Sequence, residues 1–261
     1  MKTLQISPML RSAPAATGRA TALRREAAQA GDRNYAAVSR SSYFASFDIF
    51  QWMSAEAQEA FTLASRRRQF ADGNRIYSQS EFGHEMYRIV SGAVRMSVLR
   101  RDGREALYLV LEPGDCFGTR SLLDEAPRSH TTSAKGEVEL QVLRRESCDR
   151  LRAQHPSFTD GLMRVISRHV RLLSEFFASS ALDELSCRVA QRLLKTHKVR
   201  VIHGHDIHLT IDLSQSEIAS MVGASRQAVN RVLRVFQQQG IIQIERRGLS
   251  VLDLKRLQSV A

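Results

Sequence analysis

The sequence predicts an α+β protein in which a small β-sandwich or barrel precedes a long helix, with shorter helices and a β-hairpin after it. Two observations support this fold class. Between Arg66 and Gly118, glycines recur at intervals of nine to eleven residues and separate runs rich in β-branched and aromatic residues, as in short strands joined by turns. From about Ser157 onward, apolar residues recur every three or four positions, which is the period of amphipathic helices.

The runs between the glycines are expected to be separate strands. "EMYRIV", "AVRMSVL" and "EALYLVL" alternate partially between apolar and polar residues, so each predicts a half-buried strand. Gly92 then forms a turn between the first two strands. Asp102-Gly103 forms a hairpin turn, because Asp-Gly suits the left-handed conformation. A further strand is predicted over Glu137–Leu143 and a short helix over Arg145–Ala153.

The segment from Ser157 to Leu185 contains no proline and predicts one long helix. Its apolar surface is wider than one packing seam, so we expect it to cover the β-domain and also a second copy of the chain in a two-fold dimer. A helix wholly internal to a monomer is the alternative. The first apolar stripe is Leu162, Ile166, His169, Leu173 and Phe176, and the second is Met163, Val170 and Phe177.

The stretch "SQSEIASMVGASRQAVNRVL" predicts two short helices that cross at a tight turn. Ser214 and Glu217 form a capping box for the first helix, and Ser225 caps the second. Ala219 is small where the helices cross, and Gly223 supplies the left-handed conformation of the turn. An amphipathic helix and a strand–turn–strand pair, "VRVIHGHDIHLTI", precede this stretch, and the hairpin "GIIQIERRGLSVLDL" follows it. Together these elements predict a winged helix-turn-helix.

The outer face of the second short helix carries the side chains that read DNA. Arg and Gln pair bidentately with guanine and adenine in the major groove, and a helix N-terminus favours phosphate. A net charge of +11 also favours a polyanionic partner. A solvated polar face is the alternative for one such helix alone, but it does not account for the cap, the turn glycine and the basic wing. The outer residues are Arg226, Gln227, Asn230, Arg231 and Arg234.

Several other classes of protein are not favoured by the sequence. No apolar run is long enough to span a bilayer, so no membrane association is expected. Three scattered cysteines without a Cys-x-x-Cys pair argue for a reducing, cytoplasmic location and against a disulfide framework or an iron–sulfur cluster. We find no paired carboxylates with a base and no nucleophile motif, so an enzyme is not expected. His203, His205 and His208 have metal-like spacing, but alternate residues of a hairpin point opposite ways, so no metal site is predicted.

These features resemble the Crp/Fnr family of bacterial transcription regulators over residues 43–255. The resemblance rests on the glycine-punctuated strands, the long helix and "GASRQAVNRVL" followed by a wing. It implies a cytoplasmic homodimer that binds a near-palindromic operator and contacts RNA polymerase. It also implies a β-roll sensor (a jelly-roll-like double-stranded β-helix) at 43–155, a dimerisation helix at 156–183 and the winged helix-turn-helix at 184–261. Residues 1–42 are rich in Ala, Arg and Ser, and this composition predicts a disordered basic tail. By the resemblance, Arg226, Gln227 and Arg231 read bases, and Ser214, Gln215, Ser225 and Arg234 contact phosphates.

The sensor loop "FGTRSLLDEAPRSHTTSA" departs from the family's cyclic-AMP pattern. Gly118, Ser121, Arg128 and Ser129 match the phosphate-binding positions. Thr119 replaces the ribose-binding Glu, Arg120 adds a charge, His130 stands where a small residue is usual, and Leu172-Leu173 replace the adenine-binding Thr-Ser. Because missing polar contacts typically cost about 1–3 kcal/mol each, tight cyclic AMP binding is not expected.

Two interpretations of this loop stay open. The basic groups suit a cyclic dinucleotide, or the site has no effector and Arg128 pairs with Asp124 or Glu125. In the DNA-reading helix, Gln227 stands where the family has Glu, so we expect a half-site that differs from TGTGA at one inner position. The remaining alternative is an architectural protein that binds DNA without sequence preference. Such a protein needs only Lys and Arg, so Gln227 beside Arg226 argues against it.

Overall fold

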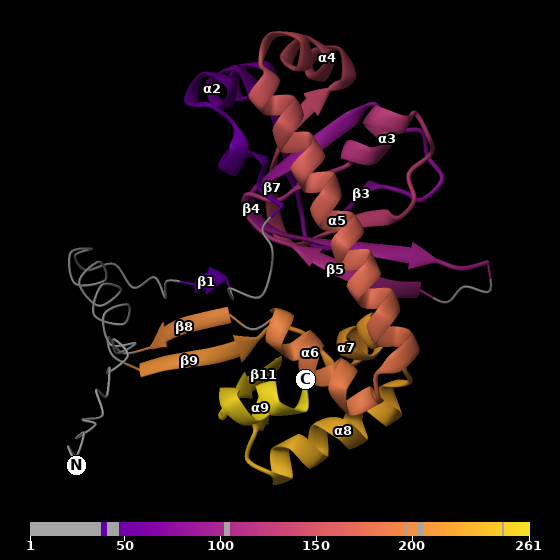
Figure 1. Cartoon of the computed structure of the whole chain (residues 1–261), viewed down its shortest axis with the longest axis vertical. Helices are drawn as coiled ribbons and strands as arrows, with labels where there is room; N and C mark the ends of the chain where they lie inside the picture. Colours follow the sequence, from indigo (N-terminus) through magenta and orange to yellow (C-terminus); the bar gives the residue numbers. More distant parts are fainter. Residues whose placement is uncertain (1–37, 41–46, 102–104, 197, 203–205, 247) are drawn as a thin grey trace, which may run out of the picture. The chain divides into compact units, whose positions relative to one another are not determined.

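The computed structural model describes residues 38–40, 47–101, 105–196, 198–202, 206–246 and 248–261 (Figure 1). The order of elements is the α+β arrangement that the sequence predicted. In the first half these are β1 (Val38–Arg40), η1 (Ile49–Trp52), α2 (Ala55–Ala64), β2 (Arg66–Phe70), β3 (Arg75–Tyr77), β4 (Glu85–Leu99), β5 (Glu105–Leu111), β6 (Cys116–Phe117), α3 (Thr119–Asp124) and β7 (Thr131–Arg144). In the second half they are α4 (Arg145–Gln154), α5 (Pro156–Leu182), α6 (Leu185–Thr196), β8 (Lys198–Ile202), β9 (Asp206–Ile211), α7 (Gln215–Val222), α8 (Arg226–Gln238), β10 (Ile242–Glu245), β11 (Gly248–Val251) and α9 (Leu254–Val260).

The β-domain is built on two long central strands, β4 and β7. The strand order is β2-β7-β4-β5, β3 also pairs with β7, β6 also pairs with β4, and every pair is antiparallel. Both strands bury apolar side chains in the core, among them Met86, Ile89, Val94 and Leu140. Helix α2, η1 and the first turns of α5 complete this core.

Gly92 does not form the turn that the sequence predicted. It lies inside β4, which runs without a break through "EMYRIV" and "AVRMSVL", and the pairing register with β7 shifts on both sides of Ser91. Gly92 has a φ of +79, and a Cβ there would lie 2.2 Å from the carbonyl oxygen of Glu137. The glycine therefore marks a bulge where two backbones approach closely, because no side chain fits there.

Helix α5 packs on the β-domain mainly with its N-terminal half. Phe158, Gly161, Leu162 and Val165 are buried. A Cβ on Gly161 would lie 2.6 Å from a side-chain carbon of Ile49, so η1 sits directly against the helix. On another side of α5 several apolar side chains are exposed, as expected for a helix with a second packing face. These exposed residues are Met163, Val170, Leu173, Phe176, Phe177 and Leu182.

The C-terminal part of the chain has its own hydrophobic core, formed by α6, α7, α8, α9 and the strands between them. Its sheet has the order β1-β8-β9-β11-β10. Strand β1 lies within the stretch expected to be a disordered tail, and it pairs with β8. The other residues of that stretch, 1–37 and 41–42, lie outside the described residues. The predicted wing is present as β10 and β11, with Gln243 opposite Ser250.

The expectations about membrane-spanning segments and metal sites can be compared with the described part of the chain only. None of its helices is both long and apolar enough to cross a bilayer. It also contains no group of three or more His, Cys, Asp or Glu side chains placed to hold a metal ion. His203 and His205, and the side chain of His208, lie outside the described residues. The cysteines are free, and burial raises the pKa of Cys116 to about 12.

Candidate DNA-binding surface and sensor pocket

Helices α7 and α8 form the predicted helix-turn-helix, and local sequence signals fix both of their ends. Ser214 and Glu217 make the full capping box at the start of α7. Gly223 ends that helix with a φ of 66°, and a left-handed residue is what such a tight turn requires. The N–H of Ala228 donates to Ser225 Oγ over 3.2 Å and caps α8. Each cap therefore satisfies an amide group in the first turn of its helix that has no partner within the helix itself.

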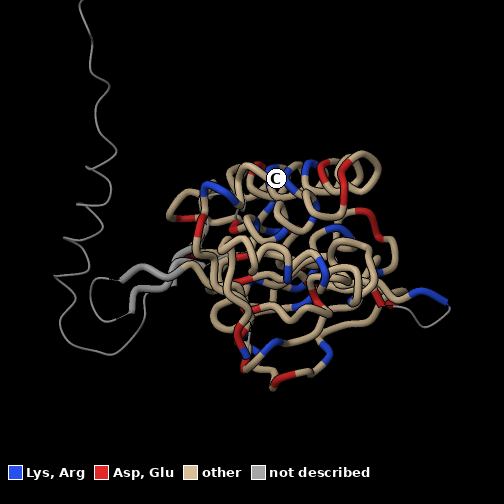
Figure 2. The backbone as a smooth tube through the Cα atoms, turned by 90° about the horizontal axis from the view of Figure 1, so that it is seen from below, with Lys and Arg blue, Asp and Glu red and all other residues tan. Residues whose placement is uncertain are grey.

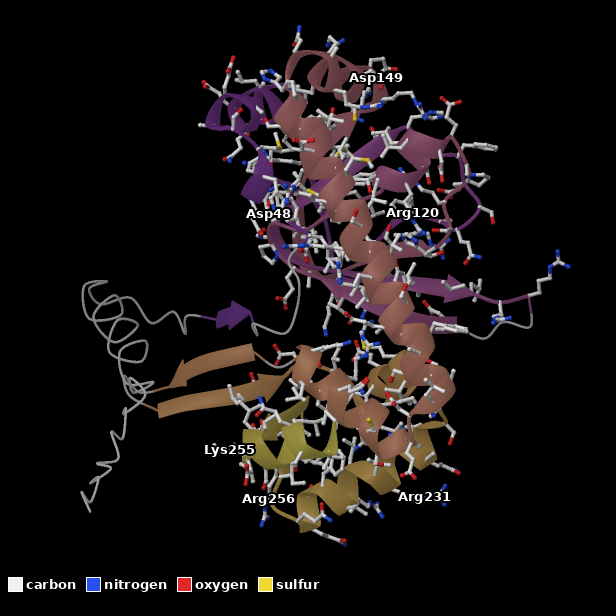
Figure 3. The ribbon with its side chains drawn as sticks, in the orientation of Figure 1. Asp48, Arg120, Asp149, Arg231, Lys255 and Arg256 are labelled. Carbon is white, nitrogen blue, oxygen red and sulfur yellow. The ribbon has the colours of Figure 1, made fainter. Side chains whose placement is uncertain are left out.

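The outer face of α8 is exposed and unpaired. Val229, Leu233 and Phe236 bury the inner face. On the outer face, Arg226, Gln227, Arg231 and Arg234 are exposed, and none of these arginines bonds or pairs with another described residue through its side chain. Arg231 points outward from α8 (Figure 3). Basic and acidic residues are interspersed over the described backbone (Figure 2), so the distribution of charged residues alone does not locate this surface.

Asn230 is the exception among the residues expected on the outer face. It is half-buried, and its Nδ2 donates to Gln215 Oε1 over 2.9 Å. This bond ties α8 to the start of α7. Gln215, which the sequence assigned to phosphate contact, therefore already has a protein partner through its side-chain oxygen, while its amide N–H₂ donors remain for a phosphate. Ser214, Ser225 and Arg234 are exposed around it.

Residues of the β-domain bond to α7, and the sequence did not predict these contacts. Arg95 of β4 forms an ion pair with Glu217, and Lys135 of β7 lies 3.7 Å from the same carboxylate. The N–H of Leu107 donates to Ser220 Oγ over 2.7 Å. Glu217 thus serves at once as a cap residue and as the partner of two basic groups from the β-domain.

The seven residues predicted for the sensor line one cavity. Gly118 ends β6 with a φ of 78° and opens α3, while the segment before β7 approaches from the other side. The cavity has a volume of ≈ 20 Å³, room for about one or two waters. Its predicted lining residues are Gly118, Thr119, Arg120, Ser121, Arg128, Ser129 and His130.

Arg128 is buried and bonded to the backbone. Its Nη1 donates to the carbonyl oxygen of Gly118 over 2.7 Å and its Nη2 to that of Glu85 over 2.6 Å. The guanidinium lies 4.3 Å from the centre of the Tyr77 ring. The predicted alternative, pairing with Asp124 or Glu125, is wrong. Glu125 instead pairs with Arg145, and the Asp124 carboxylate accepts from the backbone of Ala126.

Two of the glycines in this region are required by Arg128. A Cβ on Gly83 would lie 2.1 Å from Arg128 Nε, and one on Gly118 would lie 2.9 Å from Nη1. The guanidinium therefore fills the space that these two glycines leave open. Its Nη1 and Nη2 groups already donate to carbonyl oxygens, whereas its Nε is buried without a hydrogen-bond partner among the described residues.

Arg120, Ser129 and His130 form a second polar network in the pocket. Arg120 Nη2 donates to Ser129 Oγ and lies 3.3 Å from His130 Nδ1, and Tyr77 Oη lies 2.8 Å from His130 Nε2. Because a guanidinium can only donate, Nδ1 acts as the acceptor and Nε2–H donates to Tyr77. Burial, and then the nearby positive charge of Arg120, lowers the pKa of His130 to about 3.

Sequence reasoning missed the other lining residues, and three of these carry polar groups: Tyr77 of β3, Tyr108 of β5 and His169 of α5. His169 was placed on the apolar stripe of the helix. Its ring stacks on Phe47 at 4.1 Å, its Nε2 is buried without a partner among the described residues, and burial lowers its pKa to about 4. No motif signals these residues, because each lies in a separate element far along the chain.

Comparison with known proteins gives matches to both domains. Residues 67–155 match the model of the cyclic nucleotide-binding domain, and residues 187–260 match that of the Crp-like helix-turn-helix domain. A "CRP-like cAMP-activated global transcriptional regulator" of Mycobacterium tuberculosis is 32% identical over 210 residues, which covers 80% of this chain and 94% of the relative. The "Cyclic AMP receptor protein" of Thermus thermophilus is 27% identical, with 82% and 96% covered.

Solved structures with low identity share the fold. The regulator CLP of Xanthomonas campestris, titled c-di-GMP responsive, has a TM-score of 0.67 at 19% identity and covers 77% of this chain and 100% of its own. FixK2 of Bradyrhizobium japonicum has a TM-score of 0.64 at 22% identity, with 75% and 96% covered. These two similarities support the arrangement of elements alone.

Proposed function

Because this chain belongs to the Crp/Fnr family of transcription regulators, as its sequence predicted, we propose that it binds a near-palindromic operator as a homodimer. The observation that carries this proposal is the capped start of α8, where Arg226 and Arg231 are exposed and make no side-chain bond with a described residue. Charged donors that have no partner in the protein are free to bond to bases and phosphates.

In this proposal, Arg226, Gln227 and Arg231 contact base edges in the major groove. Ser214, Gln215, Ser225 and Arg234 contact phosphates and fix the position of the helix on the duplex. Gln227 both donates and accepts, so the half-site differs from TGTGA at one inner position. The domain bounds are 43–155 for the sensor, 156–183 for the dimer helix and 184–261 for the DNA-binding domain, in line with the matched ranges.

The dimer forms through the exposed apolar face of α5. Val170, Leu173 and Phe177 are 57%, 45% and 75% exposed. An apolar face on a long helix is the usual seam of a two-helix contact, and a two-fold axis places two DNA-reading helices one helical turn of DNA apart.

The sensor pocket operates without cyclic AMP. Arg128 is bonded to two carbonyl oxygens, Arg120 to Ser129, and the family's ribose-binding carboxylate is absent at Thr119. A cyclic nucleotide would have to break these bonds and open a cavity of ≈ 20 Å³. A cyclic dinucleotide effector and regulation without any effector are the two outcomes that the experiment below separates.

The test is selection of bound sequences from a random DNA pool, without nucleotide and with cyclic AMP or cyclic di-GMP. We expect a two-fold symmetric site whose recovery cyclic AMP does not change. Arg226→Ala should weaken binding to the selected site by about 1–3 kcal/mol and relax the preference at one position. Arg234→Ala should weaken binding to all sequences alike. Selection of no preferred sequence would support the architectural alternative, and submicromolar cyclic AMP binding in calorimetry would contradict the effector proposal.

A further inference from the structure

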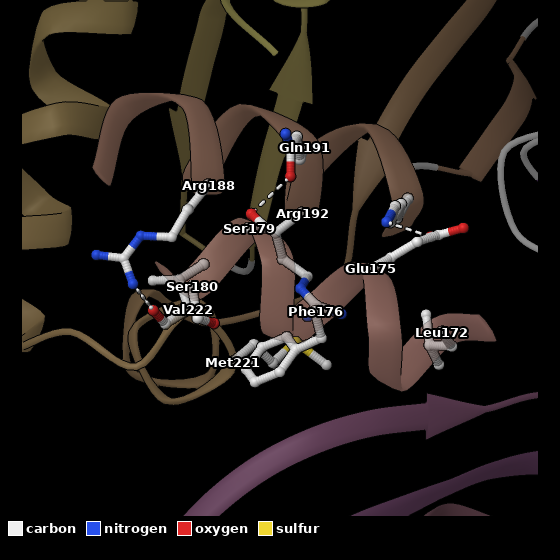
Figure 4. Close-up of a pocket in the computed structure, with 11 residues that line it drawn as sticks. Leu172, Glu175, Phe176, Ser179, Ser180, Arg188, Gln191, Arg192, Met221 and Val222 are labelled. Carbon is white, nitrogen blue, oxygen red and sulfur yellow. Dashed lines mark hydrogen bonds and ion pairs between the residues drawn. The ribbon is translucent and has the colours of Figure 1, made fainter. Parts of the chain in front are cut away.

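A second cleft lies where α5, α6 and α7 meet, and it shares no residue with the sensor pocket (Figure 4). Its volume is ≈ 30 Å³, enough for a group of a few heavy atoms but not for a nucleotide. Phe176 and Met221 supply apolar walls, while Ser179 and Ser180 bring hydroxyl groups to its edge.

Arg192 of α6 is the unusual residue of this cleft. The residue is only 7% exposed, and its Nη1 atom is buried without a hydrogen-bond partner among the described residues. The guanidinium lies 5.8 Å from the ring centre of Phe176 and makes no ion pair in the described part of the chain. Burial lowers the pKa of Arg192 to about 10, so the group is still charged at neutral pH. A buried charge without a counter-ion is unfavourable, which indicates that an anion belongs beside it.

The other charged side chains of the cleft leave it positive. Lys195 forms an ion pair with Glu175 over 3.0 Å, so the carboxylate that lines the cleft already has a cationic partner. Arg188, one helical turn before Arg192, donates from Nη1 to the carbonyl oxygen of Val222 over 2.8 Å, and its Nε is buried without a partner among the described residues. The cleft therefore holds three cationic groups against one carboxylate.

We propose that this cleft binds a small oxyanion, a phosphate or carboxylate group, with Arg192 as its principal ligand and Arg188 beside it. A guanidinium presents parallel N–H groups that match the oxygens of either anion. The apolar walls exclude water and strengthen the interaction. Since the cleft joins the end of α5 to α6 and α7, a bound anion would contact the dimer helix and the DNA-binding domain at the same time.

The test is isothermal titration of the full chain with inorganic phosphate in a chloride buffer of constant ionic strength, with succinate in a separate arm. We expect one saturable site per chain, and the arm that binds more tightly identifies the anion class. Arg192→Met, which keeps the volume but removes the charge, should weaken binding at least tenfold. Glu175→Gln should tighten binding several-fold, because it removes the negative charge that lines the cleft.

Two further variants separate this cleft from other basic surfaces. Lys255→Gln removes one exposed charge on α9 and should leave the affinity unchanged. Arg120→Gln removes a charge from the sensor pocket and reports whether the titrated anion binds there instead. If Arg192→Met does not fold by circular dichroism, Arg188→Gln and Glu175→Gln decide the outcome, with opposite expected signs. The absence of saturable binding to the wild-type chain, or binding that responds to Arg120→Gln and not to the cleft variants, would overturn the proposal.

Discussion

Lowering the pH should destabilise the folded protein through His130. The loss of stability should begin well above the pH at which the His130 ring binds a proton in the folded state. The ring is 6% exposed and bonded to Tyr77 and Ser129. Arg120 faces it from α3, and Arg128 approaches from the segment before β7. The other titratable groups around it are Tyr77 of β3, Tyr108 of β5 and His169 of α5. A proton on His130 would add a positive charge beside two guanidinium groups in a site that excludes water.

The size of the effect follows from the pKa of His130, which falls from 6.5 to about 3 on folding. A depressed pKa means that the unfolded chain binds the proton first. The stabilising contribution is therefore complete above pH 6.5 and is lost as the pH falls toward 3. At pH 5 the difference from 6.5 is 1.5 units, which corresponds to a loss of roughly 2 kcal/mol in the free energy of unfolding.

The assay is urea unfolding of the wild-type chain and of His130→Gln at pH 8 and at pH 5. The variant loses packing and hydrogen bonds at both pH values, so the informative quantity is the change in unfolding free energy between them. We expect that change to be about 2 kcal/mol smaller in the variant. Equal pH dependence in the two proteins would refute the argument that His130 is held neutral by burial and Arg120.

Three other perturbations have defined outcomes. Gly92→Ala should lower the free energy of unfolding by about 2–4 kcal/mol in urea titrations, because the added Cβ would clash with a carbonyl oxygen of β7. Gly73 has a similar φ but open space around it, so Gly73→Ala should lower the free energy of unfolding by only about 1 kcal/mol. Ser225→Ala should cost about 1 kcal/mol by loss of the α8 cap, seen as a lower Tm in calorimetry. Val170→Asp should convert the proposed dimer to monomer in analytical ultracentrifugation, whereas Leu63→Asp on exposed α2 should sediment as the wild type; an unchanged Val170→Asp dimer would place the interface elsewhere.

The helix-turn-helix is the part of the fold that the sequence predicts most fully. Ser214, Glu217, Gly223 and Ser225 act on backbone groups within three or four residues of themselves. Such local bonds are visible in the order of residues, because they need no information about the rest of the chain. The Asn230–Gln215 bond was missed, since it depends on how the two helices cross.

Only part of the sensor pocket could be predicted from the sequence. Seven of its lining residues lie within Gly118–His130, so one contiguous motif was enough to predict that they meet. Tyr77, Tyr108 and His169 enter from three other elements, and Arg128 turns away from the nearby Asp124 and Glu125 to bond the carbonyl oxygen of Glu85.

The amino-acid sequence by itself determined the order of elements, the two helix caps, the exposed outer face of α8 and the family. Only the tertiary structure decided that β4 continues through Gly92, that Arg128 donates to two backbone carbonyl oxygens, and that Arg192 Nη1 is buried without a partner among the described residues. The physical reason is distance along the chain. Turns, caps and helical faces depend on neighbours a few residues away, whereas strand register and the partners of a buried charge depend on residues tens of positions away, which the packed core brings together.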